Sequence, residues 1–277
     1  MKKNNFLFSL SMSLFLCLLL SCSDDESISN KQLLPSQIKL NYNLSSSSPG
    51  TSVEVVDAFT YDDDNRLTNI SHTYTSTSES KSVNLKNTVI KYDTDGRIIE
   101  ANITSSENSA ISKVSVEKYS YDGDKIKINK DGKDFATIQL SSKNITLTYA
   151  LVGESKEVVT YELDDRGNVI EYVFKSDYTN KYRYTTDRKN GIFKDVNTPH
   201  WFLITQTAFS EYQLENTIKR YTSGSSDDKW IEYTYNEIQY NKDLYPVSIR
   251  TKPSPDWLGI SSSTMTIEYI PAKTIIK

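Results

Sequence analysis

Apolar and polar residues alternate in seven short segments of the chain, each of which ends at a tyrosine. In every segment the residue two positions before the tyrosine is aliphatic or aromatic, and the residue between them is polar or charged. This period of two predicts a strand that is buried on one face. The tyrosines at the key position are Tyr61, Tyr92, Tyr121, Tyr161, Tyr184, Tyr235 and Tyr269.

Turn-forming residues follow several of these segments. Residues 93–96 and 164–167 both read Asp-x-x-Gly, and Asn65 takes the place of the glycine after Asp62. An aspartate side chain can cap such a turn, and glycine or asparagine tolerates a positive φ. The alternation then resumes, for example at Leu67. Each repeat is therefore predicted to be a β-hairpin, and the uneven spacing of the tyrosines indicates loops of variable length.

One segment, near residues 199–213, departs from the alternation. Four consecutive apolar residues, Trp201 to Ile204, cannot all stay in contact with water, since burying each large side chain contributes about 1.5 to 3 kcal/mol. Pro199 suits the first turn of a helix. We therefore expect a short helical insert that covers one face or end of the sheet, with Trp201, Phe202 and Ile204 buried against the concave side.

The first 21 residues have the features of an export signal. Lys2 and Lys3 precede an apolar run that ends at Leu20 and is too short to span a membrane as a helix. The run ends in Leu19-Leu20-Ser21-Cys22, which resembles the lipobox of bacterial lipoproteins and implies lipid attachment at Cys22. An ordinary signal peptide with an incidental cysteine is the alternative. We expect a signal peptide over 1–21, a lipidated tether over 22–37 and a β domain over 38–277, with the first strand at Ile38.

Two further resemblances concern location and fold. The acidic cluster at residues 23–26 resembles the signal that sends Bacteroidetes lipoproteins to the outer face of the outer membrane, although it is also what a solvated tether would contain. The Tyr-Asp-x-x-Gly-Arg pattern resembles the YD repeats of Rhs-type proteins. Together with the lipobox and the segments at 184–193 and 240–246, it resembles a family of Bacteroidetes surface lipoproteins with a porin-like fold. That resemblance implies an all-β antiparallel meander of hairpins forming one large curved or barrel-like sheet, and implies no activity.

Composition narrows the function classes. Removal of Lys2 and Lys3 with the signal leaves 30 basic and 36 acidic side chains, a net charge of −6. Nucleic acid is therefore not an expected partner, because its binding depends on clustered Lys and Arg. The two cysteines are Cys17, which lies in the signal, and Cys22. The exported domain is thus expected to have no disulfide and no thiol chemistry.

Few residues suggest catalysis or metal binding. His72 lies in a strand pattern and His200 in the apolar insert, so no histidine-based triad or metal site is expected. The loop at Asp93 lacks the closing glutamate of a calcium site, and turn formation explains it. Paired carboxylates for glycoside hydrolysis stay open as an alternative, but we expect no catalytic residue, metal or cofactor. The candidate ligand-binding residues are Trp201, Trp230 and Trp257, for which core packing is the competing interpretation.

Three functions remain. The leading hypothesis is a non-enzymatic outer-membrane lipoprotein, exposed on the cell surface, that binds a glycan, a host component or a neighbouring outer-membrane protein. Its membrane contact would be the lipid anchor, because segments such as 125–129 and 136–140 offer too few residues for strands that cross a bilayer. The second hypothesis is a barrel-type carrier of a small apolar ligand. The third is a glycan-active enzyme.

Overall fold

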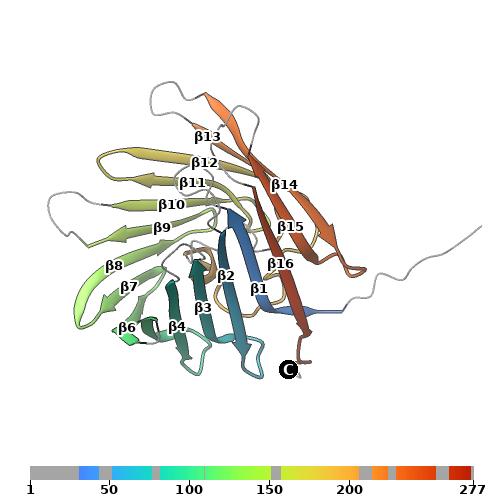
Figure 1. Ribbon diagram of the computed structural model, residues 1–277. Coiled ribbons are helices and arrows are strands. Elements are labelled where there is room, and N and C mark those ends of the chain that lie inside the picture. The colour runs from blue at the N-terminus through green and yellow to red at the C-terminus, as the bar shows by residue number, and fades with distance from the viewer. Residues whose placement is uncertain are drawn as a thin grey trace, which may run out of the picture. The chain divides into compact units, whose positions relative to one another are not determined.

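The computed structural model describes residues 31–43, 52–76, 82–108, 110–150, 157–205, 214–223, 229–253 and 262–275. Within these residues the chain forms an antiparallel meander that closes into a barrel, so the predicted all-β fold is confirmed (Figure 1). Its elements are β1 (Leu33–Asn43), β2 (Ser52–Tyr61), β3 (Leu67–Ser76), β4 (Ser82–Tyr92), β5 (Ile98–Glu107), β6 (Ala110–Asp122), β7 (Lys125–Lys130), β8 (Lys133–Leu140), β9 (Asn144–Tyr149), β10 (Val158–Leu163), β11 (Val169–Lys175), β12 (Thr179–Thr186), α2 (His200–Thr205), β13 (Thr217–Ser223), β14 (Trp230–Tyr240), β15 (Pro246–Pro253) and β16 (Ser263–Pro271).

The first and last strands close the barrel. β1 pairs with β16 from Leu33 opposite Pro271 to Tyr42 opposite Ser263, with a register shift after Pro35. The first strand thus begins at Leu33, and the prediction that it begins at Ile38 is wrong by five residues. Leu33 and Leu34 are buried, and this burial extends the strand into what was predicted to be tether.

Inward and outward side chains alternate around the barrel. On β7, for example, Ile126 and Ile128 are buried while Lys125 and Lys127 are exposed. Apolar residues from many strands meet inside and form one core together with residues of the segment between β12 and β13. The shortest of the described strands also contribute to this core. They are β7, β9 and β10, with six residues each.

Hairpin turns at one end of the barrel, here called the turn end, share one hydrogen-bond pattern. The Oδ1 atom of Asp62 accepts the backbone N–H groups of the residues two and four positions later, at 3.0 and 2.9 Å. Asp93, Asp164 and Asn241 do the same. The fourth turn residue has a positive φ in each case: Asn65, Gly96, Gly167 and Leu244. The prediction that an aspartate caps the turn is therefore confirmed at Asp62, Asp93 and Asp164, and Asn241 takes the same role without having been predicted to.

Four tyrosines reinforce this end. The hydroxyl of Tyr92 donates to the carbonyl of Leu67 at 2.8 Å, so it ties one hairpin to the hairpin before it. The same bond runs from Tyr61 to Pro35, from Tyr121 to Ile98 and from Tyr269 to Pro246. The key tyrosine is thus a structural cross-link in these four copies.

All seven predicted tyrosines lie on strands. In one copy, however, the middle residue is buried and the two residues beside it are less so, which is the reverse of the predicted alternation. Thr234, the residue between Tyr233 and Tyr235, is 5% exposed and is the buried member of the three. A register shift in the pairing of β13 with β14 explains this, because Glu232 and Thr234 pair with consecutive residues and Tyr233 is left over. The hairpin's own turn residue is Asn241, which follows Tyr240.

Candidate functional site

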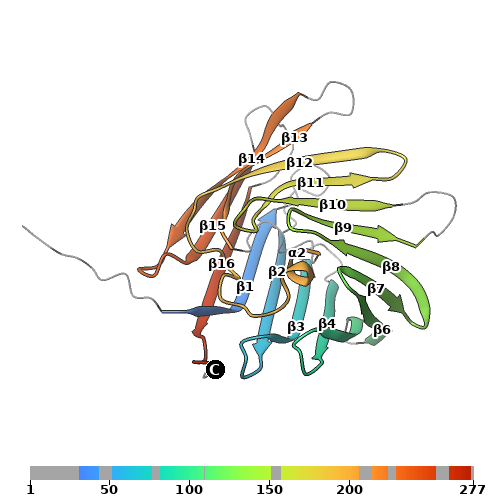
Figure 2. The ribbon, with the colours of Figure 1, turned by 180° about the vertical axis from the view of Figure 1, so that it is seen from behind.

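The segment between β12 and β13 is an insertion into one of these turns. Asp187 Oδ1 accepts the backbone N–H groups of Lys189 and Asn216, at 3.0 and 3.4 Å. The turn pattern is therefore kept while residues 190–215, here called the insert, run between its two halves. α2 is the helix of the insert and lies within the outline of the barrel in Figure 2. It ends at Thr205, and the rest of the predicted helix, residues 206–213, lies outside the described residues.

The apolar residues of the insert are buried in the barrel core, as predicted. Trp201 is 7% exposed, and Phe202, Leu203 and Ile204 are 2% exposed or less. The ring centroids of Trp201 and Tyr119 lie 5.6 Å apart. Because these side chains belong to the same cluster as residues of the strands, the insert closes the lumen at the turn end.

Polar contacts fix the insert to the barrel wall. The Asp195 carboxylate accepts the backbone N–H of Leu33 at 2.8 Å and the hydroxyl of Tyr245. Thr198 Oγ1 accepts the backbone N–H of Leu67 at 2.8 Å. These contacts reach β1, β3 and the turn before β15, so the insert is held at several points around the barrel.

The two histidines lie apart from each other in the barrel. His72 is a strand residue, as predicted, and its Nδ1 lies 2.8 Å from Asp57 Oδ1. His200 begins α2, and burial lowers its pKa to about 4, so the ring is neutral at pH 7. Among the described residues, no group of three or more His, Cys, Asp or Glu side chains is placed to hold a metal ion.

A pocket of about 120 Å³ opens above the insert, on its lumen side. Trp201 and Phe202 contribute to its lining together with Phe135 and Tyr149, whose ring centroids are 5.5 Å apart. We call it the floor pocket. Its walls are aromatic and aliphatic, which suits the apolar face of a ring-shaped ligand.

One charged pair lies at the floor pocket. The Glu117 carboxylate accepts hydrogen bonds from Lys130 Nζ at 2.7 Å and from the Tyr119 hydroxyl at 2.8 Å. Burial, together with the negative charge of Glu117, raises the pKa of Tyr119. Lys130 Nζ also lies 4.7 Å from the centre of the Phe135 ring. The pocket therefore offers an acceptor and donors beside its aromatic walls.

Further tyrosines form an aromatic wall along the strands beyond the floor pocket. The ring centroids of Tyr161 and Tyr172 are 5.4 Å apart, and those of Tyr172 and Tyr182 are 5.9 Å apart. Tyr233 follows at 6.2 Å from Tyr182. Tyr172, Tyr182 and Tyr233 are only partly buried, so their rings are partly accessible.

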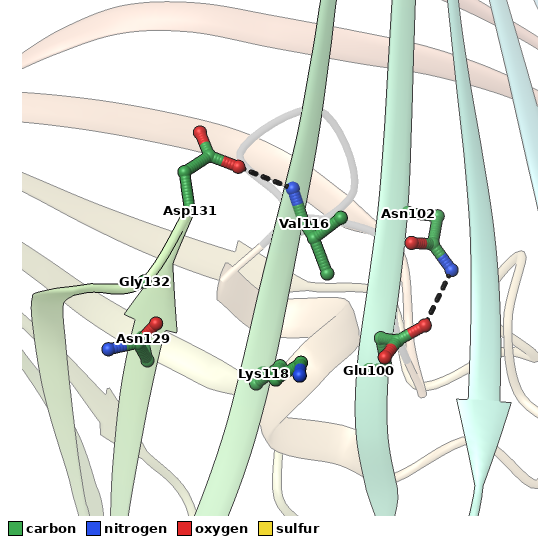
Figure 3. Close-up of a pocket in the computed structure, with 7 residues that line it drawn as sticks. All are labelled: Glu100, Asn102, Val116, Lys118, Asn129, Asp131 and Gly132. Carbon is green, nitrogen blue, oxygen red and sulfur yellow. Dashed lines mark hydrogen bonds between the residues drawn. The ribbon is translucent and has the colours of Figure 1, made fainter.

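A second depression lies on the outer face of β5 to β7. It measures about 450 Å³ and is bordered by polar side chains, including Glu100, Asn102 and Lys118 (Figure 3). Asn102 donates to Glu100 at 2.8 Å, and Asp131 accepts the backbone N–H of Val116 at 2.7 Å. None of the described residues that border it is aromatic.

The structure separates the predicted ligand-binding residues. Trp201 lines the floor pocket, whereas Trp230 lies on β14 with the Arg183 guanidinium 4.1 Å from its ring centre. Trp257 and Cys22 lie outside the described residues. Sequence reasoning missed Glu117, Phe135 and Tyr149. The alternation assigns such residues to a face of the sheet, but only the register between strands brings them together.

Comparison with a solved structure supports the fold. No family model matches the chain, and no curated protein matches it either. Among solved structures, a porin-like protein from Bacteroides uniformis ATCC 8492 superposes with a TM-score of 0.52 at 14% identity, over 85% of this chain and 96% of that one. A porin-like protein from Bacteroides vulgatus ATCC 8482 gives a TM-score of 0.41 at 15% identity, over 87% and 100%. In the described residues, no helix has the length and apolar character needed to cross a membrane.

Proposed function

We propose that this protein is a lipid-anchored outer-membrane lipoprotein whose barrel is a non-enzymatic binding module that receives its ligand in the lumen. The observation that carries the proposal is the sidedness of the barrel at the level of its core, where it is apolar inside and largely polar outside. Barrels embedded in the outer membrane show the reverse, with an apolar outer band and a polar interior. The polar wall supports a barrel that stands outside the bilayer core.

Ion pairs on the outer wall strengthen this argument. Lys91 on β4 pairs with Glu100 on β5 at 2.8 Å, and Lys219 on β13 pairs with Glu232 on β14 at 2.7 Å. These two strand pairs lie far apart in the order of strands around the barrel. Lipid would desolvate these charges at a large cost. In the part of the chain that the structure describes, exposed aliphatic side chains gather mainly on β4 to β6, where Ile111 and Val114 are 72% and 64% exposed, rather than in a band around the barrel.

The anchor follows from the sequence. Ten residues separate Cys22 from Leu33, the first residue of β1, and an extended chain of that length spans up to about 35 Å. A lipid on Cys22 would thus hold the barrel close to the membrane. The acidic residues 23–26 support an orientation toward the cell exterior.

Cys22→Ala is expected to abolish acylation and leave an unprocessed precursor. The reason is that the thiol of Cys22 is the attachment point for the lipid that precedes cleavage. Metabolic labelling with an alkynyl fatty acid and the gel mobility of the protein measure both effects. Cys17→Ala is the control and should be labelled and processed normally. Normal labelling of Cys22→Ala would refute the anchor.

The size of the floor pocket favours a saccharide over a carried lipid. Pockets that enclose drug-sized ligands measure about 300 to 1,000 Å³, whereas this one measures about 120 Å³. It has room for about one ring, with the rest of the ligand in the open lumen. Aromatic walls beside Glu117 and Lys130 match a sugar, which presents C–H groups on its faces and hydroxyls at its edge. An apolar ligand carrier is the second candidate, supported by the aromatic lining alone.

A glycan array tests this proposal with the full chain purified in detergent. We expect binding to a defined set of oligosaccharides, and their recovery without cleavage. Phe135→Ala and Tyr149→Ala should weaken binding at least fivefold, because each removes one wall of the floor pocket. Trp230→Ala, at an aromatic residue outside that pocket, is the control. Binding of a fluorescent fatty acid without any glycan would favour the carrier, and hydrolysis would favour an enzyme.

A further inference from the structure

A row of polar side chains crosses the inner face of β2 to β6 above the core. Asp57, His72, Lys86, Ser105 and Lys113 stand directly opposite one another in successive strand pairs. Each lies an even number of residues from a core residue of its own strand, with no register shift between them, so each points into the lumen. Those core residues are Phe59, Ile70, Ile90, Ala101 and Tyr119.

Two lysines of this row are accessible although they point inward. Lys86 and Lys113 are both exposed, in contrast to the buried residues nearer the insert. Both lie opposite Ser105, one on each side, and neighbouring strands are about 4.8 Å apart. Their Cα atoms are therefore roughly 10 Å apart, and the two long side chains can converge on one anion above Ser105.

The acidic groups nearby are mostly engaged elsewhere. Asp57 contacts His72, Glu117 accepts from Lys130, and Asp131 accepts from Ser115 and the backbone of Val116. Glu107 is the exception, since it ends β5 two residues beyond Ser105. Asp131 is nevertheless close enough to interact electrostatically with Lys113. Among the described residues, neither Lys86 nor Lys113 forms an ion pair, and Glu107 and Asp131 are the opposing charges near the two lysines.

Deepening the proposed function, on which this inference rests, we propose that the ligand is an acidic oligosaccharide whose carboxylate or sulfate binds between Lys86 and Lys113. Lys113 and Glu117, at the floor pocket, are four positions apart on β6, a distance of about 13 Å along the strand. One sugar ring cannot reach both places, so the ligand is an oligomer. Its charged unit lies at the lysines, and a second ring lies on the aromatic residues of the floor.

The test uses the full chain in detergent and a panel of uronate-containing oligosaccharides, each paired with its neutral methyl ester. Titration calorimetry should show that acids bind at least tenfold more tightly than their esters, with the difference shrinking at high salt. Lys86→Gln and Lys113→Gln should each weaken binding of the acid about fivefold and leave the ester unaffected. Glu107→Gln should strengthen binding of the acid, because it removes an opposing charge.

The control is Lys118→Gln, which removes a lysine from the outer face of the same strand, β6, and should change nothing. Equal affinity for acids and esters, or lysine variants that bind the acid as the unaltered chain does, would overturn the acidic ligand while leaving a glycan-binding lumen intact. Binding of no member of the panel, together with a silent glycan array, would reject the proposed function as well. Circular dichroism of each variant confirms that the barrel has formed.

Discussion

Trp201→Ala is expected to lower the free energy of unfolding by about 3 to 5 kcal/mol, the range for large aromatic residues removed from a core. Trp201 is 7% exposed, and its ring lies 5.6 Å from that of Tyr119 and 5.7 Å from that of Phe202. Phe202 and Ile204 already pack against the strands, so neither of them can refill the space. Urea unfolding of the full chain in detergent, monitored by far-UV circular dichroism so that the signal does not depend on tryptophan, measures the change.

Trp230→Ala is the matched control for this experiment. Its ring is half-buried and stacks with Arg183, and such exposed cation–π contacts contribute about 0.5 to 1 kcal/mol. Trp201→Phe should recover part of the lost stability because it keeps an aromatic ring in the core. An unfolding midpoint unchanged in Trp201→Ala would contradict the packing role. If binding were lost at the same time, Trp201 would instead be a ligand contact.

The strands and turns could be predicted because they depend on local chemistry. Asp93 illustrates this, since its carboxylate bonds to N–H groups two and four residues away, and five adjacent residues contain all of the information. Burial of Trp201 to Ile204 could also be predicted, because the cost of wetting four apolar side chains does not depend on which partner covers them.

The exact phase of the repeat could not be predicted from tyrosine alone. Before Asp164, the position that Tyr61 holds before Asp62 belongs to Leu163, and Tyr161 corresponds to Phe59. Likewise Thr186 precedes Asp187. The turn Asp or Asn is the shared feature, and a tyrosine precedes it only in some copies. Counting from these turn residues, rather than from the tyrosines, places the hairpins correctly and identifies Tyr240 before Asn241.

Closure of the barrel and assembly of the floor pocket depend on contacts between distant residues. Leu33 on the first strand pairs with Pro271 on the last strand, and no local sequence pattern indicates that pairing. Glu117, Phe135 and Tyr149 come from three strands, and their height in the lumen depends on register shifts such as that after Ile128. One extra residue in a strand changes which side chains meet.

His200 should make the barrel less stable as the pH falls from about 6.5 to about 4. Burial lowers the pKa of the folded protein's imidazole from 6.5 to about 4, so in this interval the unfolded chain binds a proton that the folded chain does not. Stability therefore rises with pH, at up to about 1.4 kcal/mol per pH unit. The total reaches on the order of 3 kcal/mol by pH 4.

In the upper part of this pH interval, the change in stability reflects protonation of the histidine and not of the turn carboxylates. The pKa of Asp93 is lowered below its ordinary value of 3.8, first by the hydrogen bond from the Arg97 backbone, so its contribution is lost only at lower pH. Unfolding free energies measured at pH 7.5, 6, 5 and 4.5 should therefore fall in the unaltered chain and stay nearly level in His200→Leu, relative to each protein's own value at pH 7.5. Equal slopes for the two proteins would show that the ring of His200 accepts a proton in the folded barrel, and would contradict its burial beneath the lumen floor.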